Sequence, residues 1–261
     1  MNTLKLLMKI TAAVAFIVPG ALLAEDQESP PLYISVDCMK STAANYASIE
    51  TDVWQPMHQE MVNQDKQYRW ALYWVMYGDR SKCDYYTVTT FLGSNQLNAR
   101  PAIEKVSEAV HPDADFAEAM SDTFESRDHV ASELWLAIDG IPPKAHRYAV
   151  VNRMKAHDPD AYERMESRVF KPGHRALVDG GYRSGWAMYA LVSPIGTSTP
   201  YDYATVDFVD HLDPVPMAEA MMTANPNRDL DELQELLDLR EQVSSETWVL
   251  VAATEQQMDG E

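Results

Sequence analysis

Two Glu-x-Trp pairs are the residues of this sequence whose types and spacing best suit chemistry. Glu133 lies two positions before Trp135, and Glu246 lies two positions before Trp248. Residues two apart in a strand point to the same face, so each carboxylate would lie beside an indole ring. A carboxylate beside Trp in a site that excludes water can have a raised pKa and act as a general acid or base. Glu133 and Glu246 are therefore the candidate catalytic residues.

Aromatic and polar side chains are predicted to share a face with these two carboxylates. Alternation along the strands assigns the following candidate ligand-binding residues to that face: Trp135, Trp248, Tyr73, Tyr189, Tyr85, Tyr203, Asp37, Asn152 and Asp207. Apolar residues such as Ile34, Val36 and Val88 would then face the helices. Mixed aromatic and polar walls suit a small, flat or ring-bearing ligand. Alternatively, the same residues form a filled interface in which the carboxylates bond to tyrosine hydroxyls or to arginines.

Both Glu-x-Trp pairs belong to a unit that the chain contains twice, over residues 32–139 and 147–254. The two copies keep order, spacing and residue type along the whole unit. The matched residues include Tyr46/Tyr162, Glu50/Glu166, Pro56/Pro172, His58/His174, Trp70/Trp186 and Tyr73/Tyr189. A repeat of this length is a small domain, because solenoid units are shorter, at roughly 20–50 residues. The short segment 140–146 links the copies.

Each copy predicts the order strand, helix, strand, strand, helix, strand. The helical segments carry apolar residues at helical spacing, and the strands alternate or are rich in aromatic and β-branched residues. The expected elements are 32–40, 44–65, 68–77, 84–92, 101–127 and 130–139, then 147–155, 159–180, 183–193, 201–210, 215–243 and 244–254. The helix over 101–127 is expected to be interrupted near His111-Pro112, and the helix over 215–243 to be broken around Asn225-Pro226. Pro56 and Pro172 are expected to kink or end their helices.

This element order is that of the ferredoxin-like split βαβ unit, whose helices cover one face of the sheet and leave the other face to a partner. Two such units in one chain resemble the dimeric α+β barrel superfamily. The resemblance implies an α+β fold of two ferredoxin-like βαββαβ units, fused in tandem into an intramolecular barrel around a cavity. The superfamily includes antibiotic-biosynthesis monooxygenases, small polyketide cyclases and chlorite-dismutase-type haem proteins, so it implies a cavity and no single activity.

Three functions are open at this point. The leading hypothesis is a protein that binds a small molecule in the cavity, extended to cofactor-independent acid–base chemistry; no cofactor and no metal are expected. The second is a haem or oxygen-dependent enzyme in which His174 is the axial ligand and Arg183 serves the distal side. No specific motif supports haem, and packing at the helix end is the alternative role for His58 and His174. The third is a non-catalytic protein that interacts through an acidic surface.

The N-terminal residues 1–24 have the features of a secretory signal. Lys5 and Lys9 accompany a short apolar run, and small residues precede Glu25. We expect a periplasmic or secreted protein, with residues 25–31 as a polar leader and 255–261 as a tail. The apolar run is shorter than the roughly 20 residues that a membrane helix needs, and no later segment qualifies.

The chain is acidic, with a formal net charge of −19. Such a charge disfavours nucleic acid and anionic membranes, so neither nucleic-acid binding nor membrane insertion is expected. A small-molecule ligand is the expected partner. The sequence is compatible with a homo-oligomer but does not determine the oligomeric state.

The chain contains two cysteines, Cys38 and Cys83, both in the first copy. Two cysteines in an exported protein usually pair, and the strands near them are expected neighbours. Strict alternation puts the two side chains on opposite faces, so the bond requires Cys83 to lie outside the regular strand. The second copy has Arg153 and Pro200-Tyr201 in these places, so the disulfide is not part of the repeated design.

Overall fold

The computed structural model describes residues 29–255. The predicted signal segment, most of the leader and all of the tail except Glu255 lie outside the described residues. Within the described part of the chain, no helix is long and apolar enough to cross a membrane.

The described chain has eight strands, and groups of short helices follow β1, β3, β5 and β7. The strands are β1 (Leu32–Ser41), β2 (Arg69–Tyr77), β3 (Tyr85–Leu92), β4 (Arg127–Ile141), β5 (Tyr148–Ala156), β6 (Gly185–Ser193), β7 (Tyr203–Val209) and β8 (Arg240–Ala253). The helices are α1 (Tyr46–Ile49), α2 (Gln55–Asn63), α3 (Gly93–Leu97), α4 (Ile103–Val110), α5 (Phe116–Ser126), α6 (Pro159–Met165), α7 (Lys171–Asp179), α8 (Met217–Ala224) and α9 (Leu230–Leu236), with a 3-10 turn at Leu237–Leu239. The mixed α+β class and the predicted element order are therefore observed.

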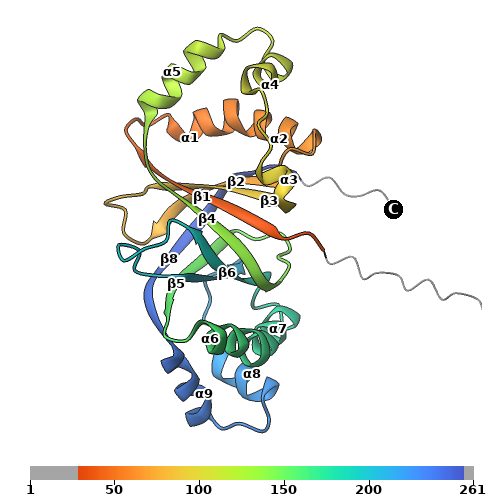
Figure 1. The fold of residues 1–261 in the computed structure, drawn as a ribbon, viewed down its shortest axis with the longest axis vertical. Helices are drawn as coiled ribbons and strands as arrows, with labels where there is room; N and C mark the ends of the chain where they lie inside the picture. Colours follow the sequence, from red (N-terminus) through yellow and green to blue (C-terminus); the bar gives the residue numbers. More distant parts are fainter. Residues whose placement is uncertain (1–28, 256–261) are drawn as a thin grey trace, which may run out of the picture.

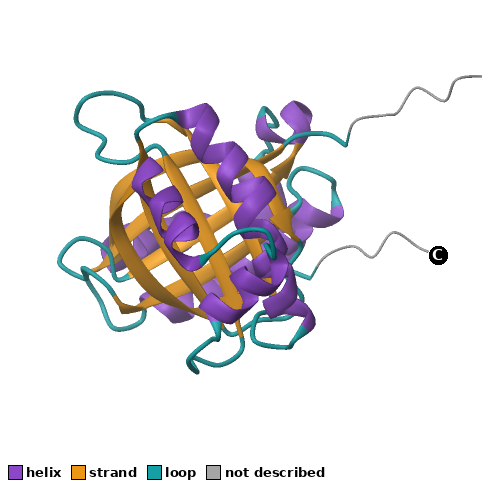
Figure 2. Cartoon of the chain, turned by 90° about the horizontal axis from the view of Figure 1, so that it is seen from below, coloured by secondary structure: helices purple, strands orange, loops and turns teal. Residues whose placement is uncertain are grey.

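The strands close into an antiparallel barrel in the order β1-β3-β2-β8-β5-β7-β6-β4 (Figures 1 and 2). In each half, the fourth strand lies beside the first, followed by the third and the second. Two seams join the halves, because β2 of the first half pairs with β8 and β6 of the second half pairs with β4. Figure 1 shows the helices of the first half at one end of the molecule and those of the second half at the other, with the strands between.

The strands β4 and β8 begin a few residues earlier than predicted. Their first residues, Arg127 and Arg240, pair with the last residues of β1 and β5, which are Ser41 and Ala156. These polar residues were predicted to end a helix but form the start of a strand. The neighbouring strand offers hydrogen-bond partners to their backbone N–H and C=O groups. The predicted helices before them are each divided into shorter helices.

In each half, the first predicted helix contains a π-helical turn just before its proline, which is Pro56 in one half and Pro172 in the other. These turns cover Glu50–Trp54 and Glu166–Phe170, directly before α2 and α7. A proline has no N–H to donate and its ring clashes with the carbonyl four residues earlier, and the wider π turn relieves both problems. Of the two predicted effects, an end of the helix is not observed, because the helices continue past Pro56 and Pro172 to Asn63 and Asp179.

The predicted disulfide between Cys38 and Cys83 is confirmed, with the two Cα atoms 5.4 Å apart. Cys83 lies before the first residue of β3, as the pairing required. The bond joins the turn between β2 and β3 to β1, and so fixes this turn at one end of the barrel.

Loss of the disulfide is expected to destabilise the protein by about 3–4 kcal/mol, because the bond closes a loop with a sequence separation of 45. Urea unfolding of the oxidised protein and of a Cys38→Ser/Cys83→Ser variant measures this difference. A reducing agent should lower the stability of the parent protein and leave the variant unchanged. Equal unfolding midpoints for the parent and the variant would contradict the prediction.

Candidate functional site

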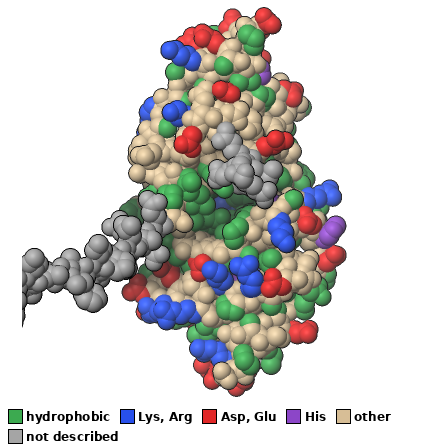
Figure 3. Space-filling model, turned by 90° about the vertical axis from the view of Figure 1, so that its right-hand side faces the viewer, with side chains coloured by type: hydrophobic (Ala, Val, Ile, Leu, Met, Phe, Trp, Pro, Cys, Tyr) green, Lys and Arg blue, Asp and Glu red, His purple; other side chains and the backbone are tan. Residues whose placement is uncertain are grey.

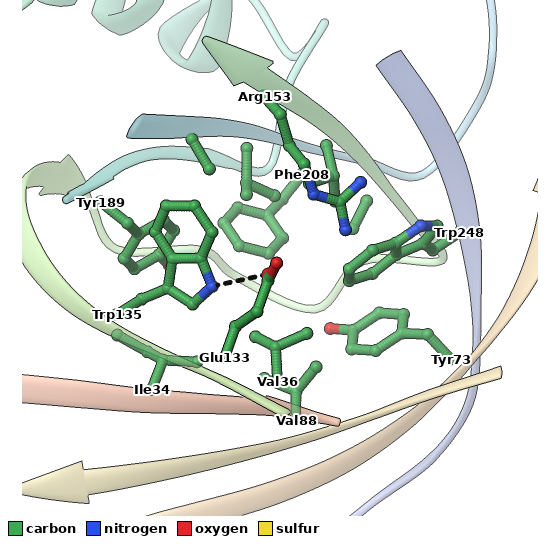
Figure 4. Close-up of a pocket in the computed structure, with 14 residues that line it drawn as sticks. Ile34, Val36, Tyr73, Val88, Glu133, Trp135, Arg153, Tyr189, Phe208 and Trp248 are labelled. Carbon is green, nitrogen blue, oxygen red and sulfur yellow. Dashed lines mark hydrogen bonds between the residues drawn. The ribbon is translucent and has the colours of Figure 1, made fainter. Parts of the chain in front are cut away.

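The barrel encloses a central cavity of about 70 Å³ (Figure 4). Its walls are largely apolar, with two indoles, two phenols and two charged side chains among them. The lining residues are Ile34, Val36, Tyr73, Val88, Glu133, Trp135, Ala149, Val151, Arg153, Tyr189, Ala204, Val206, Phe208 and Trp248. The cavity has room for only a few water molecules, since one water needs about 10–15 Å³.

The structure brings together the residues predicted on the second and fourth strands of each half. Glu133, Trp135, Trp248, Tyr73 and Tyr189 all line the central cavity. An adjoining outer cavity of about 350 Å³ is lined by Glu246. The two Glu-x-Trp pairs therefore share the lumen, as the spacing predicted, while their catalytic roles remain predictions.

The predicted orientation of the first and third strands is wrong in both halves. Tyr85 packs edge-on against Tyr46 of α1, with ring centroids 5.1 Å apart, and the Tyr203 hydroxyl donates to Glu163 of α6 at 2.8 Å. Asp207 faces the helix side, where Arg183, which lies between α7 and β6, is 2.6 Å from its Oδ1 atom. These three side chains lie outside the lumen.

Asp37 and Asn152 also lie outside the lumen. Asp37 accepts a hydrogen bond from Ser132, and the Ser245 hydroxyl donates to Asn152 at 2.7 Å. The register explains the error, because Ile34 and Val36 lie directly opposite Trp135 and Glu133, and opposed residues share a face. The apolar side chains of β1 and β5 thus fill the lumen instead of facing the helices.

A cluster around Arg153 forms the polar end of the lumen. Arg153 Nη1 donates to Glu246 Oε2 at 3.0 Å, and the same oxygen accepts from Trp248 Nε1 at 3.0 Å. The guanidinium lies over the rings of Tyr86, Tyr201 and Trp248 at 5.4–5.8 Å. Both the charge and the stacking surface of Arg153 are therefore used, which a lysine would not reproduce.

Glu133 completes this cluster from the opposite side. It accepts a hydrogen bond from Trp135 Nε1 at 3.1 Å and another from the Tyr201 hydroxyl. Burial alone would lower the pKa of Arg153, but Tyr86 and Glu246 beside it raise the pKa, so the guanidinium stays charged. Burial raises the pKa of Tyr86 to about 12, so that phenol stays neutral at physiological pH.

Arg153 and Tyr201 stand where the first copy has its disulfide, and all four residues line the outer cavity. The turn between β2 and β3 forms another wall. Gly78 of this turn has a φ of +157°, and a Cβ atom there would lie 2.9 Å from Glu246 Cγ. Sequence reasoning missed the role of Arg153, although its replacement of Cys38 in the second copy was the signal.

The opposite end of the lumen contains a histidine that sequence reasoning also missed. His146 is buried, and its Nε2 atom lies 2.9 Å from the Tyr73 hydroxyl. Burial lowers the pKa of His146, which keeps the imidazole neutral. No motif marks this residue, because it lies in the linker before β5 and has no counterpart in the repeat.

His58 and His174 lie outside the barrel, between helix and sheet. Each ring stacks on the matching tryptophan, His58 on Trp70 at 4.9 Å and His174 on Trp186 at 4.7 Å. Burial and the nearby Arg183 lower the pKa of His174 to about 2, so this imidazole is neutral. The shared geometry of the two copies supports packing as the role of both histidines.

The surroundings of His174 do not fit the haem arrangement considered from the sequence. That arrangement needs His174 and Arg183 on opposite sides of a haem, whereas the Arg183 guanidinium contacts His174 Nδ1 directly. Trp186 covers one face of the same imidazole. The described residues also contain no group of three or more His, Cys, Asp or Glu side chains that could hold a metal ion.

Comparisons with known proteins identify the fold. No protein-family model and no curated protein matches the sequence. The crystal structure of a putative monooxygenase from Lactobacillus acidophilus NCFM has a TM-score of 0.52 at 13% identity, over 88% of this chain and 97% of that one. The resemblance to the dimeric α+β barrel superfamily is therefore confirmed at the level of the fold.

Two further structures of this fold have names that refer to other chemistry. A putative chlorite dismutase has a TM-score of 0.46 at 12% identity, over 85% of this chain and 95% of that one. A haem-binding protein from Thermus thermophilus has a TM-score of 0.47 at 10% identity, over 85% of this chain and 92% of that one. The expectation that the protein has no cofactor is contradicted, because the structural neighbours include a protein named as haem-binding.

A buried carboxylate outside the lumen gives a pH-dependent prediction. Burial raises the pKa of Glu166 to about 7, although Arg240 and Tyr162 oppose the shift. The folded state then binds a proton more tightly than the unfolded state, so stability falls as the pH rises from about 4.5 to about 7. A Glu166→Gln variant should lose this part of the pH dependence, which is on the order of 2–3 kcal/mol.

Urea unfolding at several pH values measures this slope. Glu235→Gln, an exposed substitution on α9, is the control and should keep the slope of the parent protein. Parallel stability curves for the parent and the Glu166→Gln variant would show that Glu166 titrates normally.

Proposed function

We propose that the barrel lumen binds a small ligand with an apolar, ring-bearing body and a hydrogen-bonding head group. The observation that carries the proposal is that two neighbouring cavities meet at the Arg153 cluster and share it as a wall. The central and outer cavities share Val36, Glu133 and Arg153 in their walls. A ligand can therefore contact the charged cluster with its head group and the aromatic walls with its body.

The Arg153 cluster offers both hydrogen-bond donors and acceptors to a head group. Glu246 Oε2 is used by Arg153 and Trp248, while Glu246 Oε1 makes no hydrogen bond to the described residues. A hydroxyl or amide head could donate to this oxygen. We infer that Glu133 and Glu246 are the groups that would accept or return a proton if the ligand is a substrate.

The architecture and location of the protein form part of the same proposal. We infer that the two halves are ferredoxin-like units derived from a fused duplication, supported by the same spatial order of strands in each half. The disulfide supports an oxidising, extracytoplasmic location, because such bonds persist there and are rare in the cytosol.

Oxygen-dependent oxidation of the bound ligand is the second candidate function. It is favoured by the fold shared with a protein named as a putative monooxygenase. Consumption of dioxygen when a ligand is added would support this candidate, and the absorption spectrum of the protein purified from its native compartment would show whether haem is involved. A ligand that binds without oxygen uptake would leave binding as the function.

Binding can be tested with benzyl alcohol, a neutral ring with one hydroxyl group. The indole N–H signals of Trp135 and Trp248 should shift in NMR spectra, because both indoles line the central cavity. Ala204→Leu, which adds bulk inside this cavity, should weaken binding about tenfold or more by overlap with the ligand. Trp135→Phe and Trp248→Phe variants assign the two signals.

Val251→Leu is the matched control, since Val251 is exposed on the outside of β8. It should bind benzyl alcohol like the parent protein. Circular dichroism and thermal unfolding confirm that each variant is folded. Equal binding by Ala204→Leu and the parent, or unshifted indole signals, would reject the lumen as the binding site.

A further inference from the structure

The end of the lumen opposite Arg153 contains a third cavity, of about 140 Å³. Its polar lining comes from Arg69 and Thr90 on neighbouring strands, from the tyrosines Tyr68, Tyr73 and Tyr189, and from His146. None of its lining residues is acidic. In Figure 1 this end is where β1 begins, and Figure 3, which faces it, shows a hollow between the two halves with hydrophobic side chains inside.

Arg69 is the unusual residue of this cavity. Within residues 29–255 it has no ion pair and no hydrogen bond from its side chain, and its Nε atom is buried without a partner. An N–H group that is withdrawn from water without an acceptor costs stability unless something else accepts from it. The buried arginine at the other end of the lumen, Arg153, has a carboxylate at 3.0 Å.

The hydrogen bonds of His146 show which groups remain available beside Arg69. His146 Nδ1 lies 3.3 Å from the carbonyl oxygen of Lys144, which can only accept, so Nδ1 carries the proton. His146 Nε2 must then accept the hydrogen bond from the Tyr73 hydroxyl. The Tyr73 proton is thereby engaged, whereas the Tyr189 hydroxyl makes no hydrogen bond to the described residues and remains a free donor.

This third cavity adjoins the central cavity. The two share the apolar residues Ile34, Val88 and Phe208 and both tyrosines, Tyr73 and Tyr189, in their walls. A ligand anchored at Arg69 can therefore extend its body toward the central cavity. We expect the anchor to be an anionic acceptor, because the Arg69 guanidinium can only donate and no lining residue is acidic, and a planar guanidinium suits a carboxylate above all.

We propose that Arg69 and Tyr189 bind the carboxylate of a small aromatic monocarboxylate whose ring lies in the lumen. This inference rests on the proposed function of the lumen, to which it adds a chemical class of ligand and a second anchor, a carboxylate held at the end opposite the Arg153 cluster. The preference for an anion would oppose the net charge of −19, so it must come from the local site and not from the field of the whole protein.

Benzoate and benzyl alcohol have the same ring and differ in the charged head group, so their comparison tests the proposal. In the full-length protein, NMR titrations of the Trp248 indole signal should show that benzoate binds at least about tenfold more tightly than benzyl alcohol. Arg69→Met should remove that preference and leave the affinity for benzyl alcohol unchanged. Arg69 has no charged partner among the described residues that the substitution would leave unpaired, so the variant is expected to fold.

Arg147→Met is the matched control, because Arg147 is exposed beside His146 and does not line the cavity. It removes the same charge near the same end and should keep the preference for benzoate. Equal affinities for benzoate in the parent and Arg69→Met, or an equal loss in Arg147→Met, would overturn the inference while benzyl alcohol still binds. Binding of neither compound would overturn the proposed function as well.

Discussion

Closure of the sheet is the constraint on which the rest of the structure depends. The β2–β8 and β4–β6 seams complete a ring of strands, so each strand has one face in the lumen and the other toward helices or solvent. In an open antiparallel sheet one face is commonly solvated and polar. Here apolar strand residues fill the lumen and also pack against the helices, and ion pairs such as Glu166–Arg240 lie between sheet and helix.

The two halves are alike outside the barrel, whereas inside it they share the Glu-x-Trp pairs but differ at other positions. Outside, each half places a glutamate of the π turn near the arginine that opens its last strand, at 3.4 Å for Glu50–Arg127 and 3.6 Å for Glu166–Arg240. Inside, the disulfide of the first half faces the outer cavity together with Arg153, its replacement in the second half. Features repeated in both halves hold the helices on the sheet, so the unrepeated lumen residues are where specificity for a ligand can arise.

This difference also explains what could be predicted from the sequence. The duplication predicted the element order, and two cysteines near neighbouring strands of an expected exported protein predicted the disulfide. The orientation of β1, β3, β5 and β7 could not be predicted, because a strand buried on both faces lacks the polar side that alternation arguments use. Ile34 and Val36 fit the helix side and the lumen equally well by hydrophobicity, and only the register with Trp135 and Glu133 decides between them.

The residues of the site were hardest to predict where they have no counterpart in the other half. The repeat marks Glu133 and Glu246 twice, whereas Arg69 and His146 belong to no motif.

The lumen that results has two electrically different ends. At one end Arg153 is matched by Glu246 and lies near Glu133, so that end carries more acidic than basic side chains. At the other end Arg69 has no acidic neighbour in the cavity wall. Between them the walls are apolar, and charges interact more strongly across such a medium than across water. An anionic ligand in this lumen would therefore be oriented with its carboxylate toward Arg69 and its ring toward the two glutamates, which places the ring beside the groups suited to proton transfer.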